Sequence, residues 1–195
     1  MLKKMKFSKD DPLLQMKTSE LGSQLGALQR EMKGTDLSLL IILSGWEATG
    51  KGQILNDLVR ELDPRYYHLT QFDDATDVDK KHPMLWRFFQ AFPIHGRMGI
   101  FDHSIYRELM RHPDYSEMEF MHAVRDIRFT ERLLTSDGCL VVKFFLDQSE
   151  KQMEDALDAM AKDKSRSFLL EDFDHYQLKH YDKFNKHFER IINNT

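Results

Sequence analysis

The residues from Gly45 to Gly52 combine glycines and a lysine at a spacing that suits phosphate binding. They read Gly-Trp-Glu-Ala-Thr-Gly-Lys-Gly, so Gly45 and Gly50 enclose four residues and Lys51 follows directly. Successive backbone N–H groups of such a loop point into one concavity that holds phosphate oxygens, and the lysine adds a mobile positive charge. The last position usually carries a Ser or Thr hydroxyl for magnesium. Because this chain has Gly52 there, the stretch matches a phosphate loop except at its metal-binding end.

Asp102 is a second residue whose position suggests chemistry. It follows the short apolar run Met98–Phe101, which predicts a strand that ends at the carboxylate. In a doubly wound sheet, ligands bind at the carboxyl ends of the strands. An Asp at that end, on a strand beside a phosphate loop, is placed to hold magnesium.

Two arginines follow Asp102 on a predicted helix over residues 103–111. Arg107 and Arg111 are four residues apart, so they share one helix face. One interpretation is a solvated helix in which Glu108 relieves the repulsion between the arginines. The other is a mobile segment over the site whose arginines contact phosphates, since the planar guanidinium binds two oxygens at once. The sequence leaves both open.

Two charged segments have alternative interpretations. Asp73, Asp74, Asp77 and Asp79 lie in a polar stretch whose spacing does not match a calcium loop, which favours a solvated loop over a metal site. Residues 162–166, Lys-Asp-Lys-Ser-Arg, form a small basic cluster. We expect a solvated loop there as well, with contact to a polyanion as the alternative.

Strands and helices alternate along the chain, which predicts an α/β fold. Strands are predicted at residues 36–44, 66–72, 98–102 and 139–146, and helices at 13–33, 52–62, 84–92, 103–111, 117–136, 149–161 and 172–192. The continuous Leu and Ile run of the first strand is typical of a strand buried on both faces of a parallel sheet. The strand at 139–146 is also expected to be buried except at Lys143. We therefore predict a three-layer α/β/α sandwich with a mainly parallel central sheet.

Two of the predicted helices have alternative uses. The helix at 13–33 is amphipathic, with Leu13, Leu14, Leu21, Leu25, Leu28 and Met32 at roughly helical spacing. We expect that face to pack on the body of the fold, with a dimer contact as the alternative. The helix at 84–92 is rich in aromatic residues, which favours a core position over a platform for stacking bases.

The composition describes a globular chain of one ordinary domain. It has 195 residues, of which 41% are apolar and 31% charged, and a net charge of −4. That charge does not favour a nucleic-acid partner. No apolar stretch approaches the ~20 residues of a membrane span. The single cysteine, Cys139, and the lack of a secretory signal predict a cytoplasmic protein.

Taken together, the motifs resemble those of the polyphosphate kinase 2 family. The loop at 45–52 is similar to that family's unusual phosphate loop, which also ends in Lys-Gly. Residues 101–106, Phe-Asp-His-Ser-Ile-Tyr, resemble its second phosphate-site motif, a strand that ends in Phe-Asp before an aromatic-rich lid. Residues 86–89 and 96–101 look most like the polyphosphate:AMP phosphotransferase branch. The resemblance runs from about Leu21 to Phe188 and implies a P-loop kinase-like fold.

The resemblance implies a function and a set of site residues. Members of the family move a phosphoryl group between inorganic polyphosphate and a nucleoside mono- or diphosphate, with Mg²⁺; for this chain AMP is favoured over ADP, and a homo-oligomer is expected. The implied catalytic residues are Lys51, Asp102 and Glu47, of which Asp102 and Glu47 would also hold the metal. The implied phosphate- and nucleotide-binding residues are Gly45, Trp46, Ala48, Thr49, Gly50, Gly52, Arg97, Arg107 and Arg111.

The sequence departs from the family pattern at several positions. The family's loop has Asp where this chain has Glu47, its second motif has Arg where this chain has His103, and it tends to have a basic residue where this chain has Asp73 and Asp74. The family's last strand and helix lie beyond Thr195. Two explanations fit: residues 1–195 are one part of a longer tandem protein, or they are a diverged copy with a structural or polyphosphate-binding role. An ATP-using P-loop kinase is a further alternative, against which Gly52 argues.

Overall fold

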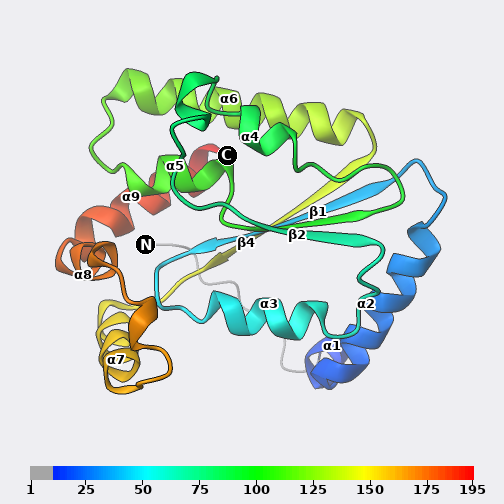
Figure 1. Cartoon of the computed structure of the whole chain (residues 1–195), viewed down its shortest axis with the longest axis horizontal. Coiled ribbons are helices and arrows are strands. Elements are labelled where there is room, and N and C mark those ends of the chain that lie inside the picture. Colours follow the sequence, from blue (N-terminus) through cyan, green and yellow to red (C-terminus); the bar gives the residue numbers. More distant parts are fainter. Residues whose placement is uncertain (1–10) are drawn as a thin grey trace.

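A computed structural model describes residues 11–195 and contains one parallel sheet in that part of the chain. The strands are β1 (Ser38–Gly45), β2 (Tyr67–Gln71), β3 (Met98–Asp102) and β4 (Cys139–Leu146). Their order in the sheet is β2-β3-β1-β4, and every pairing is parallel (Figure 1). Leu43 of β1 pairs with Asp102 of β3 on one side and with Phe144 of β4 on the other. The carboxyl ends of these three strands therefore lie side by side.

Helices cover both faces of the sheet, which confirms the predicted three-layer arrangement. One face carries α4 (Trp86–Phe89), α5 (Ile105–Arg111), α6 (Glu117–Ser136) and α9 (Tyr181–Asn194), and the other carries α2 (Thr18–Met32) and α3 (Lys51–Val59) (Figure 1). The helices α7 (Glu150–Lys162) and α8 (Asp172–Lys179) lie near the end of the sheet where β1 stops. The short elements are α1 (Pro12–Gln15), η1 (Asp79–Lys81) and η2 (Ser167–Leu169).

The central strand β1 divides the core into two clusters. Leu40 and Ile42 belong to the cluster under α5, α6 and α9, whereas Ile41 and Leu43 belong to the cluster under α2 and α3. Successive side chains of a strand point to opposite faces, and helices cover both, so all four are at most 4% exposed. The predicted burial of this strand on both faces is therefore confirmed.

The strand β4 is less buried than its apolar sequence predicts. It is an edge strand in the described part of the chain, and Leu140 and Phe144 remain 63% and 52% exposed. The prediction of burial at every position except Lys143 is wrong, because composition alone does not tell an edge strand from a central one. Lys143 finds a partner across the sheet face in Glu131 of α6, at 3.0 Å.

Two predicted helices differ in extent. Residues 172–192 form two helices, α8 and α9, because the chain leaves helical geometry at His180, where φ is −115° and ψ is 31°. The helix expected at 84–92 is confined to α4, since the chain turns on both sides of it. Within α4, Phe88 is fully buried and packs on Phe72 at a centroid distance of 4.6 Å, which agrees with a core role.

The helix α2 packs on the fold by only part of the expected face, because Leu25 and Met32 contact the core cluster that contains Ile41 and Leu43. Leu21 and Leu28 are exposed, whereas Gln29 is fully buried. The Gln29 side chain accepts from the backbone N–H of Asp63 at 2.8 Å and donates to the Asp63 carbonyl at 3.1 Å. Gly26 allows this approach, because a Cβ there would lie 2.6 Å from the carbonyl oxygen of Glu61. These two hydrogen bonds of Gln29 thus replace part of the leucine packing that the sequence predicts for this helix.

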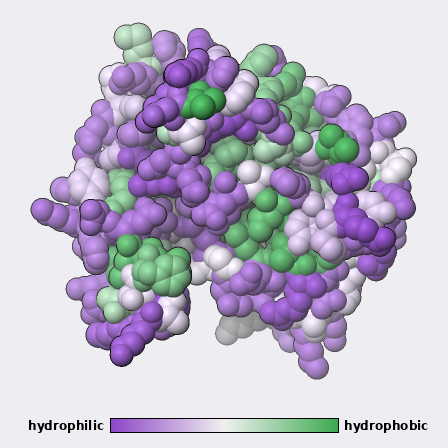
Figure 2. All heavy atoms as spheres, viewed as in Figure 1, coloured by the Kyte–Doolittle hydropathy of each residue, from purple (hydrophilic) through white to green (hydrophobic). Residues whose placement is uncertain are grey.

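The surface of the molecule is hollowed between α7 and α3. In the space-filling view, a notch separates the projecting lobe that contains α7 from the part of the molecule that contains α3 (Figure 2).

Within residues 11–195, none of the helices combines the length and the apolar character that a bilayer crossing requires.

Candidate active site

The loop after β1 is fixed at its start by a close backbone contact with β4. Gly45 has φ of +145°, and a Cβ at this position would lie 2.3 Å from the carbonyl oxygen of Leu146. The next residue, Trp46, donates its backbone N–H to the same carbonyl at 3.2 Å. Only glycine therefore allows the first loop position, which explains the first glycine of the motif in physical terms.

The middle of the loop presents backbone donors. Gly50 has φ of +80° and Ala48 has φ of +56°, so the chain turns sharply before α3 begins at Lys51. Among the described residues, the backbone N–H groups of Ala48, Thr49 and Gly50 have no hydrogen-bond partner. The first N–H groups of a helix are also free and carry partial positive charge. The loop and the start of α3 together form a cradle for an anion.

Lys51 is folded back over this cradle. Its Nζ donates to the Trp46 carbonyl at 2.8 Å and lies 3.1 Å from Glu47 Oε2. The residue is only 8% exposed. The ammonium group therefore lies within the loop rather than in solvent, where phosphate oxygens can exchange for its present partners.

A cavity of about 740 Å³ opens in front of the loop. It is lined by Glu47, Ala48, Thr49, Gly50, Lys51, Gly52, Gln53, Asn56, Asp102, Met160, Arg166, Leu169 and Asp174. These residues come from the loop, α3, the end of β3 and the segment from α7 to α8. The cavity therefore combines free backbone donors and two cationic side chains with three carboxylates.

Asp102 contributes a carboxylate at the end of the strand next to the loop. It lies at the carboxyl end of β3, beside Leu43 of β1, and its Oδ1 is buried with no hydrogen-bond partner among the described residues. A buried carboxylate oxygen is costly unless it is paired. Mg²⁺ is commonly held by one or two carboxylates together with substrate phosphates and water, so Asp102 fits this ion. Glu47 fits less directly, because it is already paired with Lys51.

The charged side chains of the cavity influence one another's pKa values. Burial raises the pKa of Glu47, but the charges of Lys51 and His103 outweigh it, so this pKa lies below its ordinary value. Burial and the Lys51 charge lower the pKa of His103. Burial raises the pKa of Asp174, with a further contribution from Glu47. The charge of Lys51 therefore favours the ionised form of Glu47, whereas burial disfavours the ionised form of Asp174.

Five predicted site residues do not line the cavity: Gly45, Trp46, Arg97, Arg107 and Arg111. The Trp46 side chain is fully buried, stacks on Tyr181 at 4.3 Å and donates Nε1–H to Asp147 at 3.1 Å. It therefore belongs to the core behind the loop. Arg97 directly precedes β3, so it lies at the amino end of this strand, whereas Asp102 lies at the carboxyl end. Its side chain donates to the Arg65 carbonyl at 2.9 Å.

Arg107 and Arg111 lie on α5, which is not a solvated helix. Arg107 is only 9% exposed, and Asp74 rather than Glu108 compensates both arginines. Glu108 instead forms an ion pair with Arg87. The solvated-loop interpretation of the four aspartates agrees with the 78% exposure of the Asp74 side chain, although its carboxylate also pairs with both arginines. Within residues 11–195, no group of three or more His, Cys, Asp or Glu side chains is arranged to hold a metal ion.

The structure adds residues that the sequence reasoning missed. Gln177 accepts from the backbone N–H of Glu47 at 3.0 Å, and Gln148 donates to the Glu47 carbonyl at 2.7 Å. Asp174 lines the cavity one helical turn before Gln177. No local pattern marks these three residues. Arg166 did have a signal, because it belongs to the basic cluster at 162–166, and its place in the cavity favours the polyanion alternative there.

The parallel sheet, the glycine loop and the carboxylate on the neighbouring strand define a phosphate-loop α/β protein of the kinase-like class. The family model described as "Polyphosphate kinase 2 (PPK2)" matches residues 6–195. The chain therefore belongs to the polyphosphate kinase 2 family.

Two curated relatives are named "Polyphosphate:AMP phosphotransferase". The one from Pseudomonas syringae pv. tomato is 32% identical over 160 residues, which are 80% of this chain and 32% of that protein. The one from Pseudomonas aeruginosa is 31% identical over 180 residues, which are 90% of this chain and 36% of that protein. The chain thus spans about a third of the length of these relatives.

A solved structure supports the same assignment. The crystal structure of polyphosphate kinase 2 from Arthrobacter aurescens TC1 superposes with a TM-score of 0.86 at 27% identity, over 91% of this chain and 66% of that one. The fold of a polyphosphate kinase 2 structure from Pseudomonas aeruginosa is also similar, with a TM-score of 0.85.

Proposed function

We propose that this chain transfers a phosphoryl group between inorganic polyphosphate and a nucleoside mono- or diphosphate, with AMP as the favoured acceptor. The observation that carries this proposal is the cavity that the loop, Lys51 and Asp102 line together, where the N–H groups of residues 48–50 and Oδ1 of Asp102 have no hydrogen-bond partner among the described residues. Membership of the family and the two relatives named for AMP support the choice of substrates.

The proposed chemistry relies on positioning and charge neutralisation, because the transferred phosphoryl group carries most of the reacting charge. The N–H groups of residues 48–50 and the start of α3 would hold phosphate oxygens. Lys51 would exchange its bond to Glu47 for one to the substrate. Bound at Asp102, Mg²⁺ would neutralise charge on the phosphate oxygens. Arg107 and Arg111 would contact further phosphates from α5.

A second candidate function is polyphosphate binding without turnover. It is favoured by the Lys51–Glu47 pair, in which the cation that would hold the transferred phosphate already has an internal partner at 3.1 Å. In this case the cavity would still bind the polyanion, and the chain would serve a structural or recruiting role.

We also propose a location, a domain organisation and an oligomeric state for the protein. We place it in the cytoplasm, where Cys139 would stay reduced. We treat residues 1–195 as one domain, which the shared sheet supports. The exposed Leu21 and Leu28 of α2 support a contact in a homo-oligomer.

The test is to incubate the chain with polyphosphate, Mg²⁺ and AMP or ADP and to separate the nucleotides. We expect phosphorylated nucleotide, and we expect Lys51→Ala to reduce kcat by about a hundredfold or more, since it removes a charge that acts on the transferred group. Lys80→Ala is the control, because Lys80 is exposed and lies 3.6 Å from Asp77, away from the residues that line the cavity.

The alternatives give different results. No product, together with measurable binding of polyphosphate, would favour the binding role. Faster transfer from ATP than from polyphosphate would identify an ATP-using kinase instead.

A further inference from the structure

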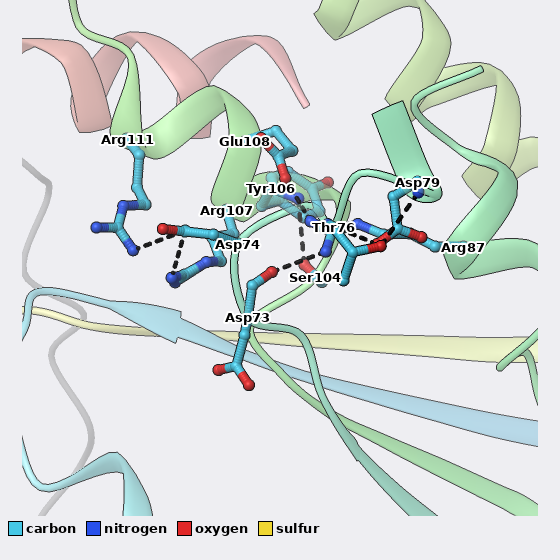
Figure 3. Close-up of polar contacts among 10 residues, drawn as sticks. All are labelled: Asp73, Asp74, Thr76, Asp79, Arg87, Ser104, Tyr106, Arg107, Glu108 and Arg111. Atoms are coloured by element: carbon cyan, nitrogen blue, oxygen red, sulfur yellow. Dashed lines mark hydrogen bonds and ion pairs between the residues drawn. The ribbon is translucent and has the colours of Figure 1, made fainter. Parts of the chain in front are cut away.

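Asp74 lies between two arginines at the edge of the candidate site. Figure 3 shows its carboxylate pointing between the side chains of Arg107 and Arg111. Asp74 Oδ1 lies 2.9 Å from Arg107 Nη2 and 3.2 Å from Arg111 Nη1. One carboxylate oxygen therefore serves both guanidinium groups, although 78% of the aspartate side chain is exposed to solvent.

The loop that carries Asp74 is tied to α5 at a second point. Arg87 donates to the backbone carbonyl of Asp73 at 2.7 Å and forms an ion pair with Glu108 of α5. The Arg87 guanidinium also lies 4.8 Å from the centre of the Phe88 ring. Arg87 thus fixes the backbone of the loop, so that the Asp74 side chain can swing away while the loop stays in place.

Both arginines lie near residues that line the phosphate cavity. The charge of Arg107 is near enough to contribute to lowering the pKa of Glu47, after the larger effects of burial and Lys51. The Arg111 guanidinium lies 4.0 Å from the centre of the Phe173 ring, and the next residue of α8, Asp174, lines the cavity. An anion held by these arginines would therefore lie close to the candidate active site.

The arginines are only partly satisfied by Asp74. Arg107 is largely buried, and its Nε has no hydrogen-bond partner among the residues that the structure describes. A buried guanidinium needs a counter-anion, and a phosphate group offers three oxygens and more charge than one shared carboxylate oxygen. A phosphate could give each arginine its own oxygen. Asp74, in contrast, is a weak occupant because most of its side chain remains in water.

We propose that the Asp74 carboxylate occupies the place of a substrate phosphate on Arg107 and Arg111, so that polyphosphate must displace it to bind. Asp74 is then an affinity-determining residue of this site. It keeps Arg107 compensated in the free protein and lowers the apparent affinity for the polyanion. This inference rests on the proposed function, since it takes polyphosphate as the ligand.

The experiment compares Asp74→Asn with wild type and with Asp73→Asn. The two variants remove the same charge from adjacent residues, but the Asp73 side chain points away from the arginines (Figure 3) and accepts from Gln71 at 3.2 Å. We expect Asp74→Asn to lower the Kd for long-chain polyphosphate roughly three- to tenfold relative to Asp73→Asn. Binding is measured by calorimetry at fixed ionic strength.

Thermal unfolding supplies a second readout. Without ligand, Asp74→Asn should unfold at a lower temperature than wild type, because Arg107 loses its counter-anion. Saturating polyphosphate should raise its midpoint more than that of wild type. A merely structural salt bridge would lower the midpoint without this larger ligand effect.

The results separate the two proposals. Equal affinities of Asp74→Asn and Asp73→Asn, with wild type still binding polyphosphate and phosphorylating AMP, would overturn the displacement model and leave the proposed function intact. Weaker binding by Asp74→Asn would also overturn it. Failure of wild type and both variants to bind polyphosphate would overturn both proposals.

Discussion

At the level of single residues, the Glu47 side chain is long enough to neutralise the charge of Lys51 within the phosphate loop. Glu47 is one methylene longer than aspartate, and its carboxylate reaches Nζ of Lys51, four residues later in the loop, at 3.1 Å. Within residues 11–195, Asp102 forms no such ion pair, and its Oδ1 at the end of β3 has no hydrogen-bond partner. The two acidic residues expected to share the metal therefore differ: Glu47 balances the lysine, and Asp102 remains available to a cation.

The buried His187 predicts how stability depends on pH. Its Nε2 lies 2.7 Å from the Leu109 carbonyl, and burial lowers its pKa despite that bond, with Arg190 acting in the same direction and Asp114 opposing it. In the unfolded chain the pKa returns to about 6.5. As the pH falls below that value, the unfolded state takes up a proton that the native state resists, so stability falls. We expect the thermal midpoint to decrease between about pH 7.5 and 5.5.

His187→Gln should reduce this decrease, because glutamine can still donate to the Leu109 carbonyl but does not titrate. His122→Gln is the matched control, since His122 is exposed on α6. Part of the decrease should remain, because the pKa of His103 is also lowered, by burial and by Lys51. An unchanged pH profile in His187→Gln would show that this histidine contributes nothing to the acid sensitivity.

At the level of elements, two glycines of the same loop should respond oppositely to alanine. A Cβ on Gly45 would collide with the backbone of β4, 2.3 Å from the Leu146 carbonyl oxygen. Gly45→Ala should therefore lower the free energy of unfolding by about 2–4 kcal/mol. A Cβ on Gly52, in the first turn of α3, would meet nothing within 4 Å. Gly52→Ala should raise stability by up to about 1 kcal/mol.

Urea unfolding of the two variants measures this contrast. Equal destabilisation would mean that β1 and β4 separate easily at Gly45 and that the close contact is not a constraint. Because Gly52 also lines the cavity, its alanine variant is a measure of stability only.

The elements that the sequence predicted well are those whose signals are local. The bounds of β4 and α6 agree with the predicted residues 139–146 and 117–136, because Ser116 caps α6 and Gly138 turns the chain between them. Burial was harder to predict, since it depends on neighbours in space. Leu140 and Leu28 are apolar and periodic in the sequence, yet both are exposed, while the polar Gln29 is fully buried.

At the level of the whole molecule, the candidate site is closed by segments far from the loop in sequence. Trp46 stacks on Tyr181, and Gln148 and Gln177 bind the backbone of Glu47. The loop, Lys51 and Asp102 could be predicted from the sequence because each has a local motif. The closing residues could not, since Gln148 and Gln177 lie 101 and 130 residues from Glu47 in the sequence and meet it only in the fold.

Arg166 tests whether this distant segment takes part in binding the polyanion. It lines the cavity from the turn after α7, opposite the phosphate loop, and its side chain has no ion-pair partner within residues 11–195. Arg166→Ala should raise the KM for polyphosphate roughly three- to tenfold with little change in kcat, because it removes one contact to the substrate and none to the loop. The effect should shrink as salt screens the interaction. Lys164→Ala removes the same charge from an exposed neighbour outside the cavity and should change KM less than about twofold. If the two variants behaved alike, the basic cluster would act only through its overall charge, and the turn after α7 would have no specific place in the site.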